Sequence, residues 1–322
     1  MAAPRIIVTR KLPDAVEARL KRHFTVALNP SDKVFTKTKM ISALQNADGM
    51  LVAVGDPLDA EVMAAGGKRK AQILANFGVG TNHIDLEAAA TEGLLITNTP
   101  DVLTDATADL ALTLMLNVTR RTWMHENRLR AGKWGGFSLV DGLGTSLQGK
   151  TLGIIGMGRI GTAVALRAYY GFGMKVAYFN RSKVEVQRIP GAQRTDTVED
   201  LIETSDVISL HCPGGEANRG LFSANRIALM KPSAFLINTA RGDVVDETAL
   251  IAALMAGKIA GAGLDVFANE PTVPEALRTL ENVCLLPHIG SATIETRTAM
   301  GMKAAANLIA HFAGKDLPNK VV

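Results

Sequence analysis

The chain has 322 residues and a formal net charge of +4, with 47% hydrophobic and 20% charged residues. This length exceeds what one hydrophobic core usually supports, so two domains are expected. Lys and Arg residues are interleaved along the chain with 31 acidic residues. That pattern argues against a nucleic-acid partner and leaves a small positive excess suited to anionic small molecules.

The sequence also bears on the compartment. The longest strongly apolar stretch, residues 108–118, has only 11 residues, whereas a membrane-spanning helix needs about 20, so no membrane is expected. Residues 1–10 hold a short apolar run closed by charge, which predicts an opening strand and not a signal peptide. Cys212 and Cys284 form no Cys-x-x-Cys motif, so reduced thiols, no metal site and a cytoplasmic location are expected.

The first hundred residues alternate short β-branched runs with helical segments. Strands are predicted at residues 5–10, 25–29, 49–54, 72–77 and 94–98, and helices at residues 14–24 and 38–47. Such alternation predicts a doubly wound parallel sheet with helices on both faces.

A second series of strands follows a long predicted helix, residues 103–131, and a glycine-rich segment, residues 132–144. The predicted strands are residues 151–156, 175–180, 207–212, 234–239, 261–266 and 283–287. The last helix, residues 292–313, has no strand after it and is expected to pack on the N-terminal domain. The sequence thus predicts an α/β protein of two doubly wound parallel-sheet domains with a cleft between them. Residues 1–99 with 290–322 form one domain and residues 100–289 the other.

A glycine-rich turn follows the first strand of the second series. Gly156, Gly158 and Gly161 form a GxGxxG motif between a predicted strand and a predicted helix. In dinucleotide-binding folds these glycines allow a tight turn, the approach of the pyrophosphate and close helix packing. The helix N-terminus adds amide donors for phosphate. A dinucleotide site is therefore predicted, and a merely structural glycine turn is the alternative.

The next strand ends without the acidic residue that usually binds the adenosine ribose of NAD. Asn180 stands at that position, and Arg181, Ser182 and Lys183 follow it. Positive charge and a hydroxyl suit a 2′-phosphate. The sequence therefore predicts that NADP is preferred and that NAD remains possible. In the alternative, Arg181 stacks on adenine or points into solvent.

Three later strands end near residues of catalytic type. Arg241, Glu270 and His288 each follow an apolar run, and each alone has a structural explanation. Together they suit reduction of a 2-oxo acid, since an Arg fork binds a carboxylate and a His paired with a carboxylate is a proton donor near neutral pH.

The motifs GMGRIG, INTARGDVVDE, AGLDVFANEP and LPHIGSAT, with NFGVGTNHID and NTPDVLTDATADLA earlier, carry a resemblance over the whole chain. The sequence resembles the D-isomer-specific 2-hydroxyacid dehydrogenase family, and most closely its glyoxylate/hydroxypyruvate reductase branch. The resemblance implies a flavodoxin-like substrate-binding domain and a Rossmann dinucleotide-binding domain. It also implies that Arg241 binds substrate and that Glu270 pairs with His288.

The resemblance further implies which residues line the site. Val54, Gly78, Val79 and Gly80 are expected to bind substrate with Arg241 and His288, the glycine pair exposing backbone amides to the carboxylate. The strand-end Asp265 is expected either to bond the nicotinamide amide or to cap a helix. The other residues expected at the cofactor are Thr107, Gly156, Gly158, Arg159, Ile160, Gly161, Asn180, Arg181, Ser182, Cys212, Pro213, Thr239, Ala240, His288 and Ser291. Gly214 and Gly215 depart from the family pattern, and a looser loop is expected there.

The predicted activity is NADPH-dependent reduction of glyoxylate and hydroxypyruvate to glycolate and D-glycerate. Two alternatives stay open: a broader D-2-hydroxyacid dehydrogenase acting on other small 2-oxo acids, and a cofactor-sensing binding protein of the same fold. The family resemblance implies a homodimer built on the long helix and the glycine-rich segment. Trp134 and Phe137 lie in that segment. Phe137 is expected either to reach the partner's substrate pocket or to pack within its own subunit.

Overall fold

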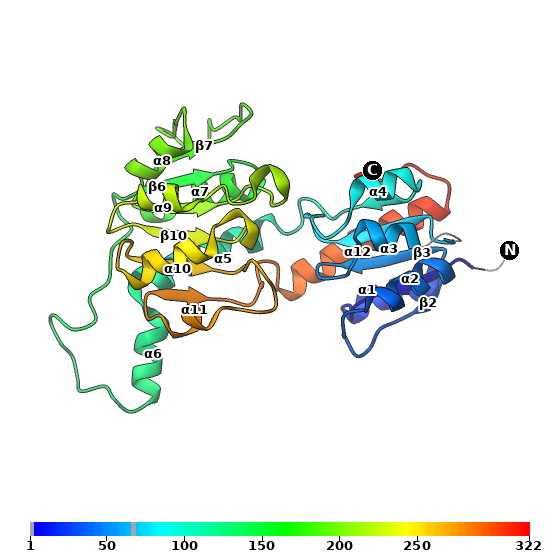
Figure 1. Cartoon of the computed structure of the whole chain (residues 1–322), viewed down its shortest axis with the longest axis horizontal. Coiled ribbons are helices and arrows are strands. Elements are labelled where there is room, and N and C mark those ends of the chain that lie inside the picture. The colour runs from blue at the N-terminus through cyan, green and yellow to red at the C-terminus, as the bar shows by residue number, and fades with distance from the viewer. Residues whose placement is uncertain (1–2, 66–68) are drawn as a thin grey trace. The chain divides into compact units, whose positions relative to one another are not determined.

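The computed structural model describes residues 3–65 and 69–322. The first two residues of the predicted opening segment therefore lie outside the described residues. The chain forms two compact units, unit 1 (Met1–Leu103 and Ser291–Val322) and unit 2 (Thr104–Gly290). Each unit contains one parallel sheet covered by helices (Figure 1).

Within the described residues, unit 1 holds a five-stranded parallel sheet of order β2-β1-β3-β4-β5. This order is that of flavodoxin-like folds. The strands are β1 (Arg5–Val8), β2 (Thr25–Ala27), β3 (Gly49–Ala53), β4 (Ile73–Phe77) and β5 (Leu95–Thr97). The helices are α1 (Asp14–His23), α2 (Lys37–Asn46), α3 (Ala60–Ala65), α4 (Leu86–Thr91) and α12 (Ile294–Phe312).

The two faces of this sheet bury different helices. Successive side chains of a strand point to opposite faces. Accordingly, Ile6 and Val8 pack with residues of α1 and α12, whereas Ile7 packs with residues of α2, α3 and α4. The C-terminal helix thus supplies part of the core of the N-terminal sheet, as the sequence predicts.

The described part of unit 2 holds a seven-stranded parallel sheet of order β12-β11-β10-β9-β6-β7-β8. If β6 is counted as the first strand, the order from β8 to β11 is the Rossmann order 3-2-1-4-5-6. Strand β12 is one further strand at the edge beside β11. The strands are β6 (Thr151–Ile155), β7 (Lys175–Phe179), β8 (Gln193–Arg194), β9 (Val207–Leu210), β10 (Phe235–Asn238), β11 (Gly261–Leu264) and β12 (Val283–Leu285).

Helices cover both faces of the unit 2 sheet. One core cluster joins the sheet to α5 (Thr104–Arg120) and α7 (Arg159–Phe172). The second cluster joins the sheet to the other helices of unit 2 apart from α6. These are α8 (Val198–Thr204), α9 (Ala224–Ala228), α10 (Glu247–Met255) and α11 (Glu275–Thr279), and short 3-10 turns occur at Glu216–Asn218 and Gly242–Val244. The predicted fold class is confirmed.

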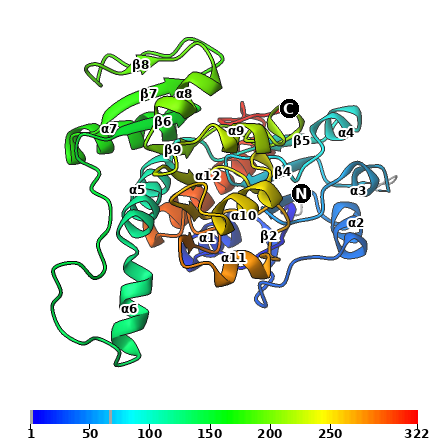
Figure 2. The same ribbon diagram turned by 60° about the vertical axis from the view of Figure 1, so that its left-hand side comes forward.

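The long helix predicted at residues 103–131 is wrong in one respect. It is broken at Arg121, whose φ of 49° lies in the left-handed region, and α6 (Thr122–Arg130) follows. The carbonyl of Thr119, which a continuous helix would give to residue 123, instead accepts from the Thr145 N–H at 2.9 Å. The Thr145 N–H therefore occupies the carbonyl that a continuous helix would use for its next hydrogen bond. Figures 1 and 2 show α6 and the loop after it extending away from the rest of unit 2.

The sequence also missed β8, because two residues are too few to show a strand pattern. Among the described residues, every helix is too short or too polar to cross a bilayer.

Candidate functional site

The glycine-rich turn after β6 is built as the motif predicts. Gly156 has a φ of 96°, and a Cβ there would lie 2.7 Å from the Cys212 nitrogen. A Cβ on Gly161 would lie 2.2 Å from the Gly156 carbonyl oxygen, so these two glycines are needed for packing. A Cβ on Gly158 would meet nothing within 4 Å. The space beside Gly158, at the N-terminus of α7, is therefore open to a pyrophosphate.

Asn180 joins this turn to the loop after β7. Its Oδ1 accepts from the Met157 N–H at 3.0 Å, and its Nδ2 donates to the Ser182 carbonyl at 2.9 Å and to the Ser182 hydroxyl at 3.1 Å. A carboxylate could accept the first bond but could not donate the other two. The amide side chain thus holds together two segments that were predicted to bind the cofactor.

The loop after Asn180 presents cationic side chains to solvent. Arg181, Ser182 and Lys183 are all exposed. The Cys212 thiol lies near Arg181: burial raises the pKa of Cys212 to about 11, and the Arg181 charge acts in the opposite direction. A thiol with this pKa is neutral at physiological pH and is not a nucleophile.

The predicted catalytic residues are brought together within unit 2. His288 Nδ1 lies 2.7 Å from Glu270 Oε2, and Glu270 Oε1 accepts from the Phe267 N–H at 3.0 Å. Burial alone would raise the pKa of Glu270, but the hydrogen bond and charge of His288, together with the Phe267 amide and the Arg241 charge, hold that pKa below its usual range. The carboxylate is therefore ionised at neutral pH and can stabilise a charged imidazole.

The backbone at His288 adopts a left-handed conformation, with a φ of 54°. Asp265, at the end of β11, fixes this turn. Its two carboxylate oxygens accept from the Ile289 N–H at 2.7 Å and the Gly290 N–H at 2.8 Å, and its carbonyl accepts from the His288 N–H at 2.9 Å. Of the two predicted roles for Asp265, the structure favours a backbone cap, although it holds a turn and not a helix.

Arg241 lies after β10 and is mostly buried. Its side chain donates to the Ala240 carbonyl, and its pKa is lowered by burial, against the charges of Glu270 and Asp243. Arginine remains charged at neutral pH even so. The guanidinium is thus a buried cation, and its charge helps to lower the pKa of Glu270.

The loop at Gly214 and Gly215, where a looser loop was expected, is packed closely against Arg241. A Cβ on Gly214 would lie 2.9 Å from Arg241 Cγ and 2.6 Å from Asp243 Oδ1. The Gly215 N–H donates to Asp243 Oδ2 at 3.0 Å, and the Asn218 side chain donates to the Pro213 carbonyl at 2.7 Å. The two glycines let the backbone approach the arginine closely.

Other residues predicted at the cofactor lie at the carboxyl side of the sheet or at helix starts of unit 2. Thr107 is buried near the start of α5, and Thr239 follows β10 with a buried hydroxyl that lacks a partner among the described residues. An unpaired buried hydroxyl is costly, so it suits a site that a ligand completes. Arg159 and Ile160 begin α7 and Ala240 precedes Arg241, whereas Ser291 belongs to unit 1.

In unit 1, the residues predicted to bind the substrate carboxylate lie together after β3 and β4. The carbonyls of Gly78, Val79 and Gly80 accept from the side chains of Asn76 and Asn98 and from the Thr99 N–H. The Gly78 N–H donates to the Asn76 carbonyl, so this amide is engaged. Among the described residues, the N–H groups of Val79 and Gly80 have no acceptor. Val54 lies against Gly78.

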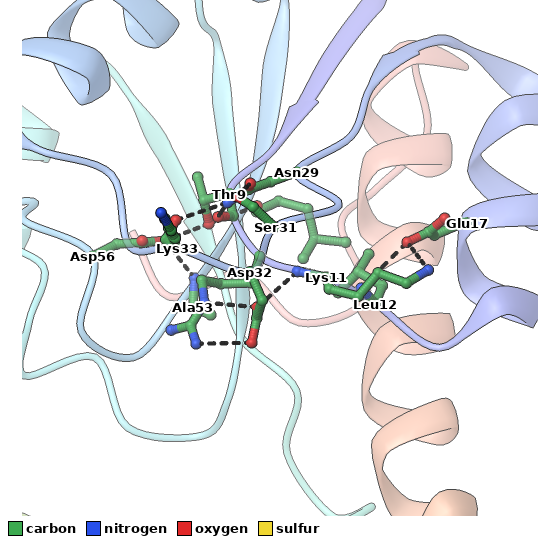
Figure 3. Close-up of polar contacts among 12 residues, drawn as sticks. Thr9, Lys11, Leu12, Glu17, Asn29, Ser31, Asp32, Lys33, Ala53 and Asp56 are labelled. Carbon is green, nitrogen blue, oxygen red and sulfur yellow. Dashed lines mark hydrogen bonds and ion pairs between the residues drawn. The ribbon is translucent and has the colours of Figure 1, made fainter. Parts of the chain in front are cut away.

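A polar network at the carboxyl ends of β1 and β3 was not predicted (Figure 3). Asp56 is 2% exposed, and its Oδ2 accepts from the Ala53 N–H at 2.9 Å and lies 2.5 Å from the Thr9 hydroxyl. Its Oδ1 is buried without a partner among the described residues, and burial raises the pKa of Asp56 despite these hydrogen bonds. The carboxyl closes the turn that carries Val54. An acid between Gly55 and Pro57, in a short turn after a strand, gave no sequence signal for this role.

Neither unit offers a metal centre within residues 3–65 and 69–322, where no group of three or more His, Cys, Asp or Glu side chains could hold an ion.

Comparison with known proteins agrees with this geometry. Residues 112–290 match the family model described as D-isomer specific 2-hydroxyacid dehydrogenase, NAD binding domain. A glyoxylate reductase of Thermococcus litoralis is 43% identical over 99% of this chain and 96% of the relative. The chain belongs to the D-isomer specific 2-hydroxyacid dehydrogenase family.

Solved structures of this family are similar over the whole chain. An NADPH-dependent glyoxylate/hydroxypyruvate reductase from Sinorhizobium meliloti, in complex with NADP and malonate, is 38% identical, with a TM-score of 0.88 over 100% of this chain and 97% of the other. A glyoxylate reductase from Paecilomyes thermophila is 32% identical, with the same TM-score over 100% and 99% of the two chains. The D-2-hydroxyacid dehydrogenase described here is therefore an NAD(P)-dependent oxidoreductase that interconverts 2-oxo and 2-hydroxy acids.

Proposed function

We propose that the protein is an NADPH-dependent reductase of glyoxylate and hydroxypyruvate, forming glycolate and D-glycerate. The observation that carries this proposal is the contact between His288 and Glu270, together with the buried cation of Arg241. The names of the relatives from T. litoralis, P. thermophila and S. meliloti favour these substrates.

Each residue has a distinct part in the reaction. When bound, the reduced nicotinamide supplies a hydride to the carbonyl carbon of the substrate. Arg241 binds the substrate carboxylate through its planar fork. Because Nδ1 of His288 is engaged by Glu270, Nε2 is the atom left to hold the proton that the nascent oxyanion takes. Glu270 orients the ring and stabilises its charged form.

Val79 and Gly80 of unit 1 are proposed to bind the carboxylate of a substrate. The unpaired N–H groups of Val79 and Gly80 are suitable donors for an anion, since their carbonyls are held by other protein groups. The N–H of Gly78 is excluded from this role by its bond to Asn76.

The preference for NADPH rests on the loop after β7. The five residues after this strand include no carboxylate, both Nδ2 hydrogens of Asn180 are donated to Ser182, and Arg181 and Ser182 are exposed. One charge-assisted contact to a 2′-phosphate contributes about 1.5–3 kcal/mol, or roughly ten- to hundredfold in affinity.

The proposal is tested by turnover of small 2-oxo acids with each cofactor. Glyoxylate and hydroxypyruvate should give the highest kcat/KM with NADPH, and Arg181→Ala should weaken NADPH binding much more than NADH binding. His288→Ala should lower kcat by about 10²–10⁴-fold while the dissociation constant of NADPH stays nearly constant. Equal use of both cofactors by the wild type would refute the cofactor assignment. Cofactor binding without turnover of any 2-oxo acid would favour a sensor.

We also propose a homodimer that forms through α6 and the loop of residues 131–146. In this segment Trp134 is 64% exposed, Phe137 89% and Leu139 81%. Exposed apolar groups of this density mark association surfaces. A cytoplasmic location of the protein is also proposed, because both cysteines are free thiols. Sedimentation at micromolar concentration should give a dimer, and Phe137→Ser with Trp134→Ser should give a monomer. A monomeric wild type would contradict the proposal.

A further inference from the structure

Arg194 lies on the edge strand β8, outside every motif discussed so far. The strand pairs in parallel with β7, with Tyr178 opposite Arg194. The Arg194 side chain is exposed, and its Nη2 donates to the Asn180 carbonyl at 3.0 Å. The guanidinium therefore lies at the carboxyl end of β7, beside the residue from which the cofactor loop starts.

Most of the hydrogen-bonding capacity of this guanidinium is unused. An arginine has five N–H donors, and Arg194 forms one hydrogen bond and pairs with no carboxylate among the described residues. A single bond from an exposed side chain to a carbonyl contributes little to stability. The remaining donors form a planar fork of the kind that binds phosphate.

The surrounding charges favour an anion at this place. Arg181 and Lys183 are exposed and follow Asn180 within three residues, and Arg194 donates to the Asn180 carbonyl from the neighbouring strand. Like charges on neighbouring segments repel one another unless an anion lies near them. In a dinucleotide fold, the ribose of the adenosine lies beyond the end of this strand.

We propose that Arg194 binds the 2′-phosphate of NADP and is a determinant of cofactor specificity, acting with Arg181 and Ser182. The proposal rests on the proposed NADPH preference and adds a residue from a different strand. In the structure the Arg194 guanidinium already lies at the carbonyl of Asn180, so binding of the phosphate requires little rearrangement of this side chain.

The test measures binding of adenosine fragments by titration calorimetry, without turnover. Adenosine 2′,5′-bisphosphate carries the 2′-phosphate, and adenosine 5′-monophosphate lacks it. In Arg194→Gln, affinity for the bisphosphate should fall about tenfold, and affinity for the monophosphate should stay within about twofold. Arg194→Lys should recover part of the loss, because it keeps the charge without the fork.

Arg188→Gln is the matched control, since Arg188 is an exposed arginine within the same loop, and it should leave both affinities unchanged. If Arg194→Gln weakens the affinity for both fragments equally, Arg194 only supports the backbone, and the inference is overturned. An unchanged preference for the bisphosphate in this variant overturns it too, while the NADPH preference stands. If the wild type binds both fragments equally, the proposed NADPH preference itself fails.

Discussion

Gly214 offers a direct test of how closely the structure holds Arg241, the arginine proposed to bind substrate. A Cβ at this position would lie 2.9 Å from Arg241 Cγ, 3.0 Å from Arg241 Cβ and 2.6 Å from Asp243 Oδ1. Carbon atoms in ordinary contact are about 3.5–4.0 Å apart, so Gly214→Ala must move the loop or the arginine by about 0.5–1 Å. Side-chain rotation cannot move Cβ of Arg241, and Asp243 is held by the Gly215 N–H.

Such overpacking costs about 1–3 kcal/mol, and a displacement of about 1 Å at a positioning group can cost about hundredfold in rate. In Gly214→Ala, kcat/KM for glyoxylate should therefore fall about ten- to hundredfold, whereas the dissociation constant of NADPH should change little. The assay is steady-state oxidation of NADPH, combined with calorimetric titration of the cofactor.

Gly171→Ala is the matched control, because a Cβ there meets nothing within 4 Å and the residue lies in α7. This variant should keep the wild-type kinetics and gain about 0.5–1 kcal/mol of stability from the loss of a helical glycine. If Gly214→Ala keeps the wild-type kcat/KM, the contact between this loop and Arg241 does not position the substrate.

Three further predictions concern single side chains. In Asn180→Asp, the lost donation to Ser182 and the added negative charge should lower affinity for NADPH relative to NADH about ten- to thirtyfold, and an unchanged ratio of the two dissociation constants would contradict this. The pKa of Glu270 lies below its usual range, so its ionised form stabilises the fold above about pH 4.3, and this contribution is lost as the pH falls through the folded-state pKa. The difference in unfolding free energy between the wild type and Glu270→Gln should therefore shrink on acidification, and a difference independent of pH would refute the ion pair. The pKa of Asp56 is raised, so its effect on stability changes with pH in the opposite direction. The wild type should lose stability relative to Asp56→Asn as the pH rises above about 3.9. Chemical unfolding from pH 3 to pH 8 measures whether this loss occurs.

The strands and the chemistry near their ends could be predicted from the sequence because both follow local rules. Buried parallel strands read as apolar runs, and in an α/β sheet the residues after them face the ligand. Arg241, Glu270 and His288 follow this rule, and two of them are in hydrogen-bond contact in the structure.

What could not be predicted depends on contacts distant in sequence. The break at Arg121 requires the Thr145 N–H, which returns from a loop more than twenty residues later. The packing of Gly214 depends on Arg241, and the role of Asp56 depends on Thr9. A looser loop was expected at Gly214 and Gly215, where glycine permits many conformations, although here glycine also permits close packing.

The composition of unit 1 from both ends of the chain has a consequence for its synthesis. Helix α12 packs on β4 and α1, where a Cβ on Gly301 would lie 2.6 Å from a methyl group of Val16, and the Ile96 N–H donates to the carbonyl of Val322. Domains usually fold as they leave the ribosome, N-terminal first. In this chain we expect the order to be reversed, because residues 104–290 are continuous and can fold while the first 103 residues still lack helix α12. One apolar face of the N-terminal sheet is then uncovered until residues 294–312 have been synthesised.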